Sequence, residues 1–173
     1  SHGLGPGRIM HEGEKVPVNL VLGELYSSIE EAKADVLGLY NTLFLVSEGV
    51  LDEKLREGAL VTFLAGVFRS VRFGIHEAHG RANLMAFNYM VDKGGYLFDP
   101  HEKRYSVDLE KAPAVVRELA REILMLQALG DYPKTKAFIE RYGSMSDNMR
   151  AVIATLADIP VDIEPLFGVE DEF

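Results

Sequence analysis

The residues whose spacing is best suited to chemistry are three carboxylates near the start of a predicted helix. Glu30 and Glu31 are adjacent, and Asp35 follows Glu31 by four residues. On a helix Glu31 and Asp35 share a face, whereas Glu30 points about 100° away. Crowded carboxylates repel one another, so they are best tolerated beside a cation or on a wetted face. The sequence therefore allows two interpretations, a metal site or a solvated helix start.

A histidine near the beginning of the chain could supply a further ligand. His2 is followed by a glycine-rich run, which would end a helix directly after the imidazole. The chain contains no cysteine, so a metal would have to be held by imidazole and carboxylate groups, and these suit zinc. A Ser-His pair at a terminus is also what cleavage of an affinity tag leaves.

His76, His79 and Asn83 form the third candidate group. If one helix carries all three, their spacing places them on a single polar stripe. Two histidines so placed could chelate a metal independently of Glu31, or could hydrogen-bond a substrate carbonyl. The structural alternative is a polar helix face that contacts a neighbouring loop.

The composition favours one soluble domain, because 47% of the 173 residues are hydrophobic and 26% are charged. A net charge of -9 argues against a nucleic-acid backbone or an anionic membrane as partner. The apolar runs are too short to cross a bilayer and no signal peptide opens the chain, so the cytoplasm is the expected compartment.

Helical spacing of apolar residues dominates the elements that must position these groups. Helices are expected over residues 27–49, 52–73, 76–93, 109–129, 133–142 and 147–156. Ser27 or Ser28 is expected to cap the first of them. A change of period predicts a β-hairpin of residues 96–98 and 103–107. Residues 1–19 are expected to form a loop with at most a short strand near 16–22, and the tail from Ile159 to be extended. The expected fold class is mainly α, a multi-helix domain with one small β-hairpin.

Taken together, these residues resemble three motifs of the dipeptidyl peptidase III family of zinc metallopeptidases. Ser1-His2-Gly3-Leu4-Gly5 is similar to the end of the family's zinc motif. Glu30-Glu31-Ala32-Lys33-Ala34-Asp35, followed by Gly38-Leu39-Tyr40, resembles Glu-Glu-Cys-(Arg or Lys)-Ala-(Glu or Asp) and Gly-Leu-Tyr, with alanine in place of the usual cysteine. Ala78-His79-Gly80-Arg81-Ala82 resembles an Ala-His-x-x-Ala helix. The similarity is greatest to bacterial and plant relatives with a short HExxH motif, some of which carry an upstream nudix domain.

The resemblance implies a zinc site and a role for each carboxylate. His2 would be the second zinc histidine and Glu31 the third protein ligand. Glu30 and Asp35 would orient the zinc-bound imidazoles, as carboxylates do around many metal sites. The expected fold is then the helical zinc-bearing lobe of such a peptidase.

The resemblance also implies a peptide substrate, held by His79 together with His76 and Asn83, although some members carry arginine at the position of Asn83. The first zinc histidine and the general-base glutamate have no counterpart in the sequence and are expected upstream of Ser1. Residues 1–173 are thus expected to be a single domain and the C-terminal part of a longer metallopeptidase-like protein. Its missing N-terminal part would be its partner, and the chain alone would be inactive. The alternative is a non-catalytic helical interaction domain derived from the same family.

Overall fold

The structure is a computed structural model that describes residues 2–162. The strands are β1 (Arg8–His11), β2 (Glu14–Pro17), β3 (Tyr96–Asp99) and β4 (Arg104–Val107). The helices are α1 (Val18–Leu22), the 3-10 turn η1 (Gly23–Leu25), α2 (Tyr26–Ser47), α3 (Leu55–Phe73), α4 (Ala78–Asp92), α5 (Ala112–Leu129), α6 (Tyr132–Tyr142) and α7 (Asp147–Ala154). The expected mainly α fold is confirmed, and so is the hairpin of β3 and β4, in which Tyr96 pairs with Val107.

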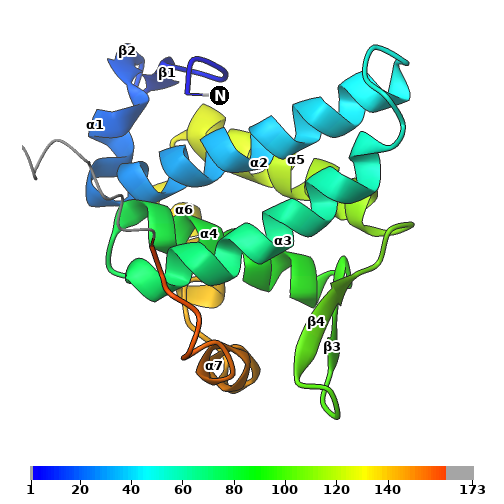
Figure 1. Ribbon diagram of the computed structural model, residues 1–173. Helices are drawn as coiled ribbons and strands as arrows, with labels where there is room; N and C mark the ends of the chain where they lie inside the picture. Colours follow the sequence, from blue (N-terminus) through cyan, green and yellow to red (C-terminus); the bar gives the residue numbers. More distant parts are fainter. Residues whose placement is uncertain (1, 163–173) are drawn as a thin grey trace, which may run out of the picture.

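Helix α2 lies at the centre of the fold. It runs beside α5 on one side and contacts α4 and α3 on the other (Figure 1). Its apolar side chains recur at helical spacing and are buried in the main core: Ile29, Ala32, Val36, Leu39 and Leu43. Burying a valine, leucine or isoleucine side chain contributes about 1.5–3 kcal/mol, so the core fixes how α2 is rotated. That rotation decides where the carboxylates of α2 point.

The start of α2 differs from the prediction. The helix begins at Tyr26, directly after η1, and its N-cap position is Leu25, which has helical dihedral angles and no side-chain cap. Ser27 and Ser28 therefore lie inside the helix, and Ser28 is buried. A turn of 3-10 helix that leads straight into an α-helix supplies backbone partners, so a serine cap is not needed.

Helix α4 begins at Ala78, two residues later than predicted, and His76 lies in the bend before it. The helix start packs tightly on the preceding connection, since a Cβ at Gly80 would lie 2.1 Å from the carbonyl oxygen of Gly74. The prediction of one helical stripe holding His76 with His79 and Asn83 is therefore wrong for His76.

The first residues form a second hairpin, which the periodicity of the sequence does not predict. Strands β1 and β2 pair antiparallel, and the turn residues Glu12 and Gly13 have φ angles of 50° and 86°. Two positive φ angles are typical of a two-residue type I′ turn. Residues 18–22, where the sequence allows a short strand, form α1 instead.

This hairpin docks on the end of α5. Ile9 is buried with Val18 and Leu22 in a small second core. Gly130, the C-cap of α5, has a φ of 59°, and a Cβ there would lie 2.3 Å from Cδ1 of Ile9. The left-handed turn therefore favours glycine at this position, and a larger residue would also have to displace the end of the Ile9 side chain.

The remaining boundaries agree with the prediction within a few residues. Asp131 and Ser146 cap α6 and α7 by accepting hydrogen bonds from the backbone of residues 134 and 149. Most of the predicted extended tail falls in residues 163–173, outside the described part of the chain. Among residues 2–162, no helix has the length and apolar character needed to span a membrane.

Candidate metal centre

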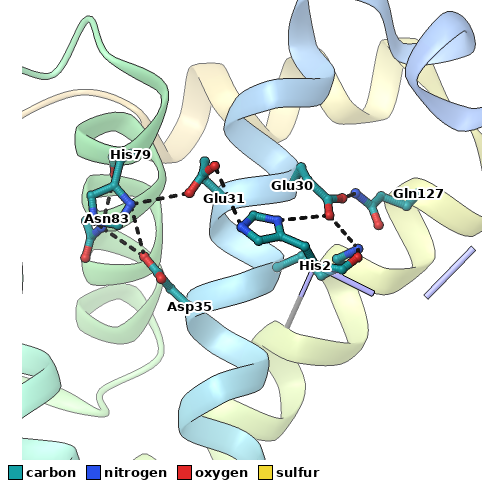
Figure 2. Close-up of polar contacts among 8 residues, drawn as sticks. His2, Glu30, Glu31, Asp35, His79, Asn83 and Gln127 are labelled. Atoms are coloured by element: carbon teal, nitrogen blue, oxygen red, sulfur yellow. Dashed lines mark hydrogen bonds and ion pairs between the residues drawn. The ribbon is translucent and has the colours of Figure 1, made fainter. Parts of the chain in front are cut away.

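The carboxylates of α2 lie on two different helix interfaces. Glu31 and Asp35 point toward α4, where they meet His79 and Asn83 (Figure 2). Glu30 points toward α5 instead, as its position about 100° around the helix requires. The predicted sharing of one face by Glu31 and Asp35 is thus confirmed.

His2 lies between the two adjacent glutamates. Its Nδ1 atom is 3.2 Å from Oε1 of Glu30, and its Nε2 atom is 4.0 Å from Oε1 of Glu31. A carboxylate can only accept a hydrogen bond, so the Nδ1–H group of His2 donates to Glu30. The lone pair of Nε2 is then directed toward Glu31 (Figure 2).

Glu30 is held by two further donors. Nζ of Lys33 lies 2.9 Å from its Oε1 atom, and Nε2 of Gln127 donates to its Oε2 atom at 2.7 Å. Burial raises the pKa of Glu30, but the hydrogen bonds from Lys33, Gln127 and His2 outweigh burial and leave that pKa below its usual value. Glu30 is therefore a carboxylate anion that orients other groups.

His79 joins the other carboxylates to the start of α4. Its Nδ1 atom is 3.5 Å from Glu31 and 3.6 Å from Asp35. Asn83, one turn further along, donates to Oδ2 of Asp35 at 3.1 Å and lies 3.3 Å from Nε2 of His79. Burial raises the pKa of Asp35, although His79 and Asn83 both oppose the shift.

A groove of about 790 Å³ begins beside this cluster and runs between α2 and α3. Asp35, His79 and Asn83 line one end of it. The rest of its wall consists largely of small residues: Ala34, Gly38, Thr42, Gly58, Ala59, Thr62 and Gly66. Two of the predicted substrate residues, His79 and Asn83, therefore border a concave surface, whereas His76 lies in the bend before α4.

The donor set of His2 and Glu31 fits zinc, although the described residues do not complete a site. Among residues 2–162 no three His, Asp or Glu side chains are arranged to hold a metal ion. Zinc binds imidazole nitrogen and carboxylate oxygen at about 2.0–2.2 Å in tetrahedral sites. Two ligand atoms of one such zinc ion lie roughly 3 Å or slightly more apart. The 4.0 Å between Nε2 of His2 and Oε1 of Glu31 would therefore need only a small movement of these side chains.

Sequence reasoning assigned no role in the site to Lys33 or Gln127, which lie within hydrogen-bonding distance of Glu30. Gln127 occupies a buried position on α5 beside Ile123 and Leu126, where the helical pattern calls for an apolar residue. A polar residue at such a position was the available signal. Its partner lies 97 residues away in the sequence, so the pairing itself could not be predicted.

Two solved structures are similar to the chain over nearly its whole length. The structure of DPP III from Caldithrix abyssi is 49% identical in sequence, with a TM-score of 0.95 over 99% of this chain. Dipeptidyl-peptidase III from Corallococcus sp. strain EGB is 36% identical, with a TM-score of 0.91 over 99% of this chain. The chain spans 33% and 32% of those two chains, respectively.

A curated relative, Nudix hydrolase 3 of Arabidopsis thaliana, is 38% identical over 98% of this chain, which spans 22% of that protein. The match is consistent with the expectation that some relatives carry a nudix domain. The chain matches no protein-family model. In sequence and in fold, it is thus similar to about a third of a dipeptidyl-peptidase III.

Proposed function

We propose that this chain is part of a zinc-dependent peptidase of the dipeptidyl peptidase III type, in which His2 and Glu31 bind the metal. The observation that carries the proposal is the placement of His2, with Glu30 at one ring nitrogen and Glu31 facing the other. The likeness to two dipeptidyl-peptidase III structures supports the reaction class.

Bound zinc would polarise a peptide carbonyl and lower the pKa of a water molecule. The residues of this chain prepare that chemistry. Glu30 accepts the Nδ1–H of His2, which leaves the Nε2 lone pair free to bind. Asp35 and Asn83 hold His79 at the end of the groove, where it would contact the peptide.

The remaining ligand and the general base would come from residues outside this sequence, since the chain spans about a third of the similar peptidase chains. The proposal expects His-Glu and one further residue immediately before Ser1 in the parent gene, completing HExxH with His2. Reading that gene tests the expectation directly. A parent sequence without the His-Glu pair would remove the base and favour a non-catalytic helical interaction domain.

The direct test is zinc affinity in the intact protein, measured by competition with a chromophoric chelator. Glu31→Gln should weaken zinc binding by more than about 100-fold, because outer partners of a ligand alone contribute about 10–100-fold. Glu48→Gln is the matched control, since it makes the same change at the other end of α2. Peptide hydrolysis should be lost with Glu31→Gln and kept with Glu48→Gln.

Two results would contradict the proposal. Intact, folded protein that binds no zinc would favour the interaction domain. Full zinc binding by Glu31→Gln would move the metal to a site independent of Glu31, such as one built on His76 and His79.

A further inference from the structure

Lys33 and Gln127 are buried polar side chains whose polar groups meet at one carboxylate. The exposed fraction is 3% for Lys33 and 0% for Gln127. Such residues are almost never fully buried without a specific partner. The partner here is Glu30, at 2.9 Å from Nζ of Lys33 and 2.7 Å from Nε2 of Gln127.

We infer that Lys33 and Gln127 are positioning residues that hold Glu30 and the backbone of His2, and thereby fix the direction of the Nε2 atom of His2. The inference rests on the proposed function, because it assigns Nε2 of His2 to a metal. Lys33 acts twice, since its Nζ atom also donates to the carbonyl oxygen of His2 at 3.1 Å. We call Lys33 and Gln127 the Glu30 clamp.

The clamp controls the tautomer of His2 as well as its direction. The ring can place its lone pair at Nε2 only if Nδ1 carries the proton, and Glu30 accepts that proton's hydrogen bond. A Glu30 side chain free to rotate would release Nδ1. Both oxygens of Glu30 are engaged by the clamp, one by each residue, so the carboxylate has a single orientation.

The segment that follows His2 packs on the same two side chains. Gly5 has a φ of 91°, which favours glycine. A Cβ at Gly5 would lie 3.6 Å from Cδ of Lys33 and 3.7 Å from Oε1 of Gln127. The clamp therefore contacts the chain at Gly5 as well as at His2, beside Cδ2 of Leu124, which would lie nearest to that Cβ at 3.1 Å.

The arrangement serves orientation better than it serves stability. Oε1 of Gln127 is buried and has no hydrogen-bond partner among the described residues, which is unfavourable for folding. A buried ion pair such as that of Lys33 with Glu30 is also often no more stabilising than apolar residues of the same size. An apolar pair at these positions would fill the same space but would leave Glu30 without a fixed orientation.

The test is the tautomer of His2 in the metal-free full chain, observed by long-range ¹H–¹⁵N NMR of the imidazoles at mildly alkaline pH. A His2→Gln variant assigns the signal. The wild type should show the Nδ1–H form. Gln127→Met should shift His2 toward the Nε2–H form and weaken zinc binding by about tenfold or more.

Matched controls separate positioning from packing. Thr135→Val removes a buried hydroxyl of α6 that has no hydrogen-bond partner among the described residues, and it should change neither signal. Lys33→Met should shift the His2 tautomer and weaken zinc binding as Gln127→Met does. Lys33→Arg should keep the Nδ1–H form. Lys134→Met, on the surface, should change neither the tautomer nor the zinc affinity.

An unchanged His2 tautomer in folded Gln127→Met would overturn the inference. If Lys33→Met does not fold, Gln127→Met still tests the inference, because it removes no charge and is therefore expected to fold. The two hypotheses fail separately. A chain that binds no zinc but shows the tautomer shift refutes the proposed metal role of His2 and retains the clamp.

Discussion

Two polar clusters lie at opposite ends of α4, and they are built in opposite ways. The acidic cluster at the start of the helix comprises Glu31 and Asp35 of α2 with His79 and Asn83 of α4. The tyrosine cluster at its end consists of tyrosine hydroxyls, carboxylates and cations: Tyr89, Asp92, Lys93, Glu118, Arg141 and Tyr142.

Every carboxylate of the tyrosine cluster has both a hydroxyl donor and a cation. Glu118 accepts from Tyr89 at 2.9 Å and pairs with Lys93 at 2.9 Å. Asp92 accepts from Tyr142 at 3.0 Å and pairs with Arg141 at 3.1 Å. Such a saturated network needs nothing further from outside the chain.

The carboxylates of the acidic cluster lack such partners. Among residues 2–162 no lysine or arginine pairs with Glu31 or Asp35, and the nearest imidazole nitrogen lies 3.5 Å away. Carboxylates with few partners keep the capacity to interact with a cation, whereas saturated ones are already satisfied within the fold. The two ends of one helix thus carry a carboxylate cluster with few partners and a saturated one.

The largest expected effect on stability comes from Gly80→Ala, which should disrupt the acidic cluster alone. A Cβ at residue 80 would collide with the carbonyl oxygen of Gly74, so the start of α4 must move. We expect a loss of about 1–3 kcal/mol in the free energy of unfolding, measured with urea. Hydrogen exchange should increase at residues 78–83 and stay unchanged near the tyrosine cluster.

Gly58→Ala is the matched control for that change. A Cβ at Gly58 in α3 meets no atom within 4 Å, so the same substitution should stabilise the protein by about 0.5–1 kcal/mol. Equal stability of Gly80→Ala and the wild type would mean that the start of α4 is not fixed by its contact with Gly74.

The next effect concerns Tyr142 in the tyrosine cluster. Burial, followed by the hydrogen bond to Asp92, raises the pKa of Tyr142 to about 12. Its protonated form therefore stabilises the fold fully below about pH 10, and this contribution is lost as the pH rises to about 12. Tyr142→Phe should cost about 1 kcal/mol near neutral pH and flatten the loss of stability above pH 10.

Urea unfolding at a series of alkaline pH values measures that slope. Tyr89, whose pKa is also raised, should keep part of the pH dependence in Tyr142→Phe. An identical slope in the variant and the wild type would show that Tyr142 is not part of the saturated network.

The smallest effect on stability should come from Asp35→Asn, and its sign distinguishes the two clusters. Burial raises the pKa of Asp35, so its charged form disfavours folding at neutral pH. The metal-free variant should equal or exceed the wild type in stability at pH 7, by no more than about 0.5 kcal/mol, and the gain should vanish at acid pH. Clear destabilisation at pH 7 would mean that Asp35 serves the fold.

The local part of the site could be predicted from the sequence. The spacing of Glu31 and Asp35 predicts their common face, and Gly94 and Gly130 mark helix ends correctly. The first hairpin was missed because its strands are only four residues long and lie among glycines and prolines, although Glu12-Gly13 is a recognisable two-residue turn.

The long-range part could not be predicted. The pairing of Glu30 with Gln127 depends on how α2 and α5 pack, and the start of α4 at Ala78 depends on the contact between Gly80 and Gly74. Neither interaction leaves a periodic pattern, because each joins segments whose proximity is decided by the whole core.

The central place of α2 has a consequence for how such a site can be lost. The rotation of α2, and with it the position of its carboxylates, is set by buried apolar side chains such as Ile29 and Ala32 of the main core. The core therefore fixes the positions of these residues on α2 as long as the domain is folded, whereas the direction of the Glu30 side chain also depends on the Glu30 clamp. Related sequences could therefore lose the polar groups one at a time and keep the fold. Mutations that damage the core would remove both the fold and the site.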